Sequence, residues 1–231
     1  MGLTKHCIAA VMMTCLALPG RAAPAAGDLD RVLRELDAAA ANFRSTSADF
    51  EFDTYQTDPF PNKDTQQGTV YYDRNGAAFS MAAHIAAMNG KPAPKVYTVV
   101  GGVFRLFEPV IDQVTTSRKV SKYESYLELG FGASGKDLAD KWNITDLGPE
   151  VIDGVKTEKL ELVAKDPDVL KLFPKVTIWI DPARGVSLKQ VFDEGQGQSR
   201  VCVYYNIKVN QPLPADAFKL KTDSKTQYVE H

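Results

Sequence analysis

The chain has 231 residues, of which 44% are hydrophobic and 10% aromatic, and its formal net charge at pH 7 is −2. This length fits one domain with a sizeable core. The small net charge argues against a general binder of nucleic acids or anionic membranes, so we expect no nucleic-acid partner.

Residues 1–26 predict a secretory signal peptide. Lys5 supplies a positive charge, the apolar run from Cys7 to Leu18 is too short to span a bilayer, and the small residues of "GRAAPAAG" follow. Cleavage is expected between residues 22 and 26. Met12-Met13-Thr14 is a poor match to the small-residue motif that precedes a lipidated cysteine, so Cys15 is not expected to carry a lipid.

Residues 27–231 are expected to form a single domain without an internal disulfide. Cys7 and Cys15 lie in the predicted signal peptide, which leaves Cys202 as the one cysteine of the mature chain. The fold of an exported protein with one cysteine must rest on burial of its core.

The mature chain is predicted to begin with one amphipathic helix. Asp28 is a suitable N-cap. The apolar residues that follow recur at helical spacing: Leu29, Val32, Leu33, Leu36, Ala40 and Phe43.

From Ser47 the hydrophobic pattern changes to a period of two, which predicts strands. "SADFEFDTYQT" is one strand, and "QGTVYYDRNGAAFSM" is a hairpin around the tight-turn pair Asn75-Gly76. "PKVYTVVGGVFRLFEP" is a second hairpin that turns at Gly101-Gly102, and "DQVTTSR" adds a further strand.

The second half of the chain begins with "SKYESYLELGFGASGKDLADKW", which predicts two short helices. "NITDLGPEVIDGVKTEKLELVAKD" then predicts a hairpin, and "PDVLKLFP" is a helical turn or an irregular lid. Residues 175–209 predict three strands. With ten or eleven strands and three helices, the fold class is α+β and mainly β.

Residues 175–209 also show a continuous apolar face, and few helical patterns are available to cover it. A second packed layer would make this face a filled core. A half-closed barrel would instead leave a cavity suited to acyl chains. Composition alone does not decide between the two.

The segment "GFGASGKD", from Gly130 to Asp137, resembles a phosphate-binding loop, but Asp137 stands where a Ser or Thr would hold magnesium. The sequence before it looks helical and not like a buried parallel strand. We favour a capping box in which Ser134 caps the next helix and Asp137 completes the motif.

No pattern in the sequence indicates an enzyme, a cofactor or a metal. His84 stands alone, no second His or Cys gives a metal-ligand spacing, and no nucleophile signature is present. The acidic residues Asp49, Glu51 and Asp53 share one strand face, for which a solvated surface is favoured over a carboxylate site.

From Leu29 to Leu220 the order of elements resembles the LolA-like family, the periplasmic carriers and sorting factors for outer-membrane lipoproteins. The phrases that carry the resemblance are "AANFRSTSADFEF", Gly68 followed six residues later by Arg74, "GGVFRLFEPVIDQVT", "LELGFGASGKDLADKW" and the closing strands up to "NQPLPADAFKL". Asn75-Gly76 departs from the family, in which the better-known carriers have proline after the arginine.

The resemblance implies a strongly curved antiparallel half-barrel whose concave face is plugged by helices, with acyl chains bound between sheet and helices. Arg74 matches the strand-end arginine that holds the helical lid closed, which makes it a candidate lid latch. Strand alternation selects these candidates for a lipid-binding cavity: Phe50, Phe52, Val70, Tyr72, Phe79, Met81, Ile178, Ile180, Leu188, Val203, Tyr205 and Ile207.

The function that the resemblance implies is that of a soluble, monomeric periplasmic carrier. It would bind acyl chains of lipoproteins or similar amphiphiles for outer-membrane sorting, with transport partners at the inner and outer membranes. The alternative is a regulatory protein of the same fold that senses lipid or mislocalised lipoprotein. An enzyme with a lipid-like substrate ranks third, because no nucleophile and base were found.

Overall fold

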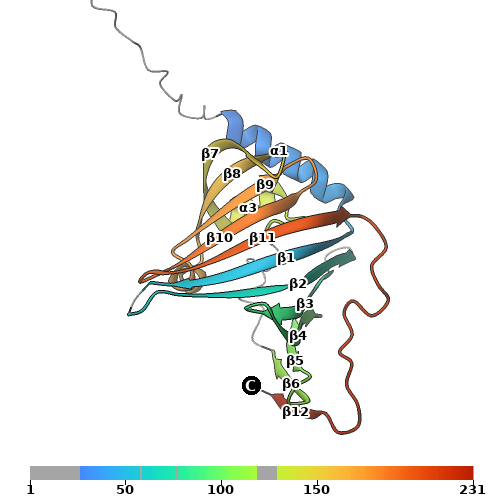
Figure 1. Ribbon diagram of the computed structural model, residues 1–231. Coiled ribbons are helices and arrows are strands. Elements are labelled where there is room, and N and C mark those ends of the chain that lie inside the picture. Colours follow the sequence, from blue (N-terminus) through green and yellow to red (C-terminus); the bar gives the residue numbers. More distant parts are fainter. Residues whose placement is uncertain (1–26, 58, 76–77, 119–128, 231) are drawn as a thin grey trace, which may run out of the picture.

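The computed structural model describes residues 27–57, 59–75, 78–118 and 129–230 (Figure 1). The expected signal peptide lies outside the described residues. So do Gly76 of the predicted tight turn and residues 119–128, where the first of the two short helices was expected.

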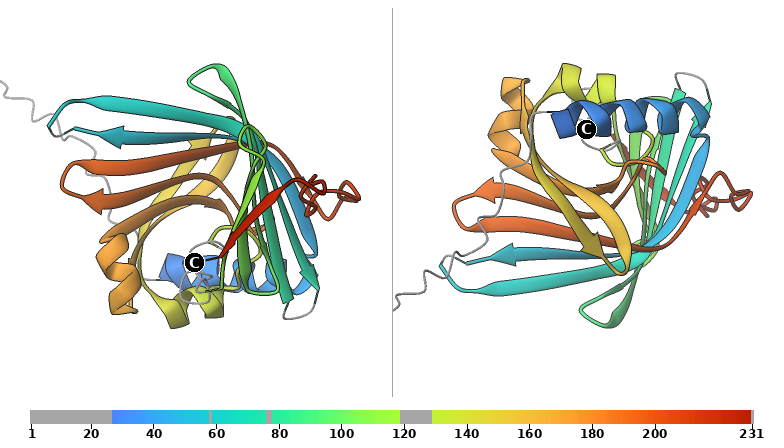
Figure 2. Two further views of the ribbon diagram at one scale, coloured as in Figure 1. Left: turned by 90° about the horizontal axis from the view of Figure 1, so that it is seen from below. Right: turned by 90° about the horizontal axis from the view of Figure 1, so that it is seen from above.

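Twelve strands of the described chain form one sheet in the order β7-β8-β9-β10-β11-β1-β2-β3-β4-β5-β6-β12. The strands are β1 (Ser45–Gln56), β2 (Asn62–Asn75), β3 (Ala78–Met88), β4 (Lys91–Val100), β5 (Val103–Glu108), β6 (Gln113–Ser117), β7 (Trp142–Ile152), β8 (Val155–Ala164), β9 (Lys175–Asp181), β10 (Val186–Gly195), β11 (Gln198–Val209) and β12 (Gln227–Glu230). Each neighbouring pair is antiparallel except β12 with β6. The sheet stays open and curves strongly (Figure 2), which confirms the predicted half-barrel.

Three helices of the described residues accompany the sheet: α1 (Gly27–Asn42), α3 (Gly135–Lys141) and α4 (Pro167–Leu172). α1 contacts α3 and β7 on the concave side, toward which the β7–β10 end of the sheet curls (Figure 2). Within the described chain, no helix combines the length and apolar character needed to cross a bilayer.

The start of α3 confirms the predicted N-cap at Ser134, but Asp137 binds the Ser134 hydroxyl and not its backbone N–H, as a capping box would require. The Ser134 hydroxyl accepts a hydrogen bond from the Asp137 backbone N–H (3.0 Å) and donates one to the Asp137 carboxylate (2.7 Å). Asp166 caps α4 in a similar way, with Pro167 in the first turn. "PDVLKLFP" is therefore helical at its start.

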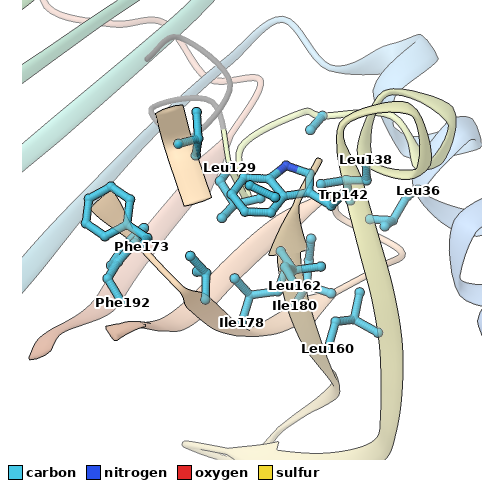
Figure 3. Packing of buried hydrophobic residues seen from close by; sticks show 14 of the residues in the cluster. Leu36, Leu129, Leu138, Trp142, Leu160, Leu162, Phe173, Ile178, Ile180 and Phe192 are labelled. Atoms are coloured by element: carbon cyan, nitrogen blue, oxygen red, sulfur yellow. The ribbon is translucent and has the colours of Figure 1, made fainter. Parts of the chain in front are cut away.

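The space between the helices and strands β7–β10 is filled. Leu36 of α1 and Leu138 of α3 meet the inward side chains of these strands (Figure 3), and Val32 of α1 belongs to the same cluster. We call this cluster the helix-covered core. Its members are Val32, Leu36, Leu129, Ala133, Leu138, Trp142, Leu160, Leu162, Ala164, Val169, Phe173, Val176, Ile178, Ile180 and Phe192.

An ion pair between a half-exposed arginine and a buried glutamate fixes α1 to the sheet. Arg31 of α1 donates to Glu158 of β8 (2.5 Å) and to Glu35 one helical turn later (3.0 Å). The hydrogen bond to Glu158 and then that to Glu35 raise the pKa of Arg31. The Glu158 side chain is nearly fully buried, so removal of Arg31 would leave an uncompensated buried charge.

The C-terminal tail packs on the convex face of strands β3–β6. After β11 it runs to the far edge of the sheet (Figure 1), where β12 pairs with β6. Ala217 is buried and its carbonyl lies 2.8 Å from the His84 ring nitrogen Nε2. The Thr226 hydroxyl donates to Asp112 (2.7 Å). The sequence analysis missed β12, because four residues are too few to show alternation.

We expect Leu160→Ala to lower the free energy of unfolding by about 2–5 kcal/mol, because it opens a cavity in the helix-covered core. Leu160 is 0% exposed, whereas Val151 on the neighbouring strand β7 is 65% exposed. Val151→Ala is therefore the matched control and should change stability by less than about 0.5 kcal/mol. Urea unfolding of both variants checks this, and equal losses would contradict the assignment of the core.

Candidate functional site

An aromatic wedge divides the concave face of the sheet. Phe131, which precedes α3, is fully buried and forms a β-bridge with Val186. Its ring stacks on Tyr72 with centroids 4.1 Å apart and meets the edge of Tyr204 at 4.8 Å. On one side of this wedge lies the helix-covered core, and on the other side no helix of the described residues covers the face.

The glycines around the wedge serve its packing. Gly130 and Gly132 have φ values of +78° and +72°, which L side chains rarely adopt. A Cβ on Gly132 would lie 2.3 Å from the Phe43 ring, and one on Gly130 would lie 2.5 Å from the Ser187 hydroxyl. The "GFG" sequence is thus needed for backbone geometry and close approach.

A buried glutamine ties the wedge to the sheet. Gln190 of β10 donates to the Leu129 carbonyl (2.5 Å) and accepts from the Tyr204 hydroxyl (3.1 Å). Burial raises the pKa of Tyr204 and of Tyr72 well above the usual range. Both phenols therefore stay neutral, as an apolar site requires.

Beside the wedge lies a cavity of about 480 Å³, which is within the range of about 300–1,000 Å³ that is typical of ligand sites. It is formed by strands β1–β5, β10 and β11 and by the residue after α4. The lining side chains are Phe50, Phe52, Thr54, Gln66, Val70, Tyr72, Met81, Ala83, Ile85, Tyr97, Phe104, Phe173, Gln190, Phe192, Arg200, Cys202 and Tyr204.

Among the described lining residues, the charged side chain of Arg200 lies away from the wedge, whereas the polar groups at the wedge, Gln190 and Tyr204, are hydrogen-bonded to each other. Phe50 and Tyr72 lie near the wedge, whereas Thr54 of β1 pairs with Arg200 of β11 further along the strands. Thr54 is about 13 Å from Phe50 along β1, at about 3.3 Å per residue. The arrangement suits a molecule with an apolar chain and a polar end.

Seven of the twelve predicted cavity residues gather around this site. Phe50, Phe52, Val70, Tyr72 and Met81 line the cavity. Phe79 and Ile207 pack against the hydrophobic cluster that contains Tyr72 and Phe131. The ring centroids of Phe79 and Tyr72 are 5.8 Å apart.

Ile178, Ile180 and Leu188 are buried away from the cavity. Ile178 and Ile180 belong to the helix-covered core, where α1 and α3 occupy the space that a ligand would need. Leu188 is buried but lies outside both the cavity lining and the two hydrophobic clusters. For these strands, the apolar face noted in the sequence is filled core.

Val203 and Tyr205 lie on the face opposite to the cavity, which corrects the alternation expected for β11. Their neighbours Cys202 and Tyr204 point inward, and Val203 pairs with the outward Glu51. The register between β1 and β11 shifts beside Asn206, which has φ of +52°. This bulge reverses the alternation, so Ile207 points inward while Tyr205 points outward.

Four lining residues were therefore not predicted from the sequence: Cys202, Tyr204 and Arg200 on β11 and Gln190 on β10. The sequence held two signals in "VCVYYNIKV". Either of the two adjacent tyrosines could face inward, and the Asn that follows them tolerates a left-handed backbone.

Arg74 lies one residue before the end of β2, opposite Phe79, and its backbone N–H donates to the Arg44 carbonyl (2.7 Å). The first of the two short helices, expected in residues 119–128, lies outside the described chain, so the expected helical lid is described only in part. The lid latch stays a prediction.

No protein-family profile matches the sequence, and no curated protein is recognisably similar to it. Among solved structures, an uncharacterized conserved protein from Thermus thermophilus matches with a TM-score of 0.55 at 10% identity, over 88% of this chain and 99% of that one. MucB matches at 0.52 and 13% identity, over 88% of this chain and 66% of its own.

A putative outer membrane lipoprotein-sorting protein domain from Vibrio parahaemolyticus matches at 0.44 and 14% identity, over 82% of this chain and 95% of that one. The chain therefore shares its fold with the Thermus thermophilus protein and with MucB. At these identities the likeness concerns the backbone. The aromatic wedge and the lining of the cavity are features of this chain's own side chains.

We expect Cys202 to resist alkylation in the native protein. Burial raises the pKa of its thiol to about 12, against about 8.5 for a free thiol, so the thiolate fraction at pH 8 falls roughly a thousandfold. Labelling with iodoacetamide, with Cys7 and Cys15 replaced by serine, should be slow in buffer and fast in urea. Rapid native labelling would show that Cys202 is accessible.

Proposed function

We propose that this protein is an extracytoplasmic carrier that holds an acyl chain of a lipoprotein or a similar amphiphile in the cavity beside Phe131. The observation that carries the proposal is the half-open cavity of about 480 Å³ lined mostly by apolar and aromatic side chains. It lies on the part of the concave face that the helices leave uncovered.

The contacts suit reversible binding. Each buried methylene contributes about 0.8 kcal/mol. About ten methylenes would therefore contribute about 8 kcal/mol before the cost of association is subtracted. Because such contacts have no preferred direction, the acyl chain can leave the cavity once a partner offers an equally apolar site. A carrier needs this balance between shielding and release.

The chemistry of the lining favours binding over catalysis. Cys202, whose thiol pKa is raised to about 12, is a poor nucleophile. None of the described lining residues is a histidine, and His84 faces the C-terminal tail on the convex side. The cavity therefore lacks a paired nucleophile and base among these residues.

The predicted signal peptide supports export, and the LolA-like fold supports a place in the periplasm and in the sorting of lipoproteins to the outer membrane. On this proposal the carrier receives its cargo at the inner membrane and delivers it to an acceptor at the outer membrane. Arg74 is proposed to hold a lid over the cavity between these two events.

The test is to extract lipid from protein purified from a membrane-containing host, detect it by native mass spectrometry, and titrate a fluorescent fatty acid. Met81→Glu places a charge in the cavity wall and should weaken binding at least tenfold, because burial of an unpaired carboxylate is costly. Val203→Glu adds the same charge on the opposite face of the sheet and is the matched control.

Equal binding by both variants would contradict the location of the site. Absence of both co-purified lipid and fatty-acid binding in the unaltered protein would overturn the carrier proposal. A stable protein partner recovered in that case would favour the lipid- or lipoprotein-sensing regulator.

A further inference from the structure

The described residues that line the cavity include one charged side chain, Arg200. It lies on β11 opposite Thr54 of β1 and Phe192 of β10. Gln66, a further polar lining residue, pairs with Phe52, two residues before Thr54 on β1. Arg200 and its neighbours thus form a polar mouth, which we define as Thr54, Gln66 and Arg200.

Glu194 holds the guanidinium of Arg200 from outside the cavity. The Arg200 Nη2 and the Glu194 Oε1 are 2.7 Å apart, and Glu194 is not among the lining residues. The Arg200 side chain is 43% exposed and that of Glu194 is 15% exposed. A guanidinium has five N–H donors in a rigid fork, so one contact leaves donors for a second acceptor.

The groups at the mouth are suited to oxyanions. The Thr54 hydroxyl, the Gln66 amide and the Arg200 guanidinium can all donate hydrogen bonds, and a guanidinium binds carboxylate or phosphate in a bidentate manner. No carboxylate lines the described cavity. A cationic headgroup would meet the Arg200 charge there, whereas the nearby Glu194 carboxylate is already paired with Arg200.

We propose that the cavity selects amphiphiles with an oxyanion headgroup, which binds at Arg200 while the acyl chain extends along β1 toward Phe131. This inference rests on the proposed function and adds the direction in which the amphiphile lies in the cavity. The amphiphile enters with its acyl chain first, and its headgroup stays at the half-exposed mouth. There a donor or an acceptor, whether protein or membrane, can reach the headgroup.

The experiment compares three probes that share one chain length: dodecanoate, dodecyl phosphate and dodecanol. Their affinities for the full chain are measured by calorimetry at low salt. We expect at least one anionic probe to bind about fivefold tighter than the alcohol, as for a half-exposed ion pair, and this preference to shrink at high salt. If dodecanoate binds more tightly than dodecyl phosphate, the preferred headgroup is a carboxylate. If dodecyl phosphate binds more tightly, it is a phosphate.

Three variants locate the preference. Arg200→Gln should abolish it and leave dodecanol binding unchanged. Glu194→Gln removes a competing carboxylate and should tighten anion binding severalfold. Lys208→Gln is the matched control, because Lys208 is an exposed cation on the same strand outside the cavity.

The outcomes separate the two proposals. If all three probes bind equally and Arg200→Gln changes nothing, the headgroup inference is overturned while the acyl-binding function stands. If the unaltered protein binds none of the probes, the proposed function itself fails. If Arg200→Gln fails to fold, as circular dichroism would reveal, Glu194→Gln still decides, since unchanged anion affinity in that variant contradicts the inference.

Discussion

The position of one aromatic ring decides how this open sheet can be used. Phe131 is held between Tyr72 and Tyr204, and Gln190 anchors its backbone through Leu129. These contacts close one half of the concave face and leave the other half as a cavity. They depend on two residues with positive φ, so the backbone conformation of a short connecting segment determines where a ligand can lie.

This division separates stability from binding. The helix-covered core contains large buried residues of α1, α3 and β7–β9, and the Arg31–Glu158 pair fixes α1 over it. The cavity wall is built mainly from the other half of the sheet, β1–β5, with Phe173 and Phe192 at the boundary. A protein arranged in this way can leave one region unfilled because another supplies the buried apolar area that folding needs.

Periodicity was sufficient to predict α1, eleven of the strands and the Ser134 cap, because each of these depends on neighbours in the sequence. The face that Val203 and Tyr205 occupy was not predictable in this way, because one bulge at Asn206 reverses the alternation. The burial of Ile178 under α1 depends on a contact between distant segments, and so does the pairing of β12 with β6. Local sequence patterns do not predict contacts between segments that are distant in the sequence.

An apolar cavity persists only if its wall resists collapse, because the side chains around a void lose packing contacts and tend to close over it. The strands behind Tyr97 and Phe104 bury their convex side as well: Thr98, Phe107 and Val114 are buried there. The C-terminal tail packs on this side through Ala217 and is fixed at its end by Thr226 and β12. These contacts cover residues behind the cavity wall, and close packing of this kind resists the side-chain movements by which a void collapses.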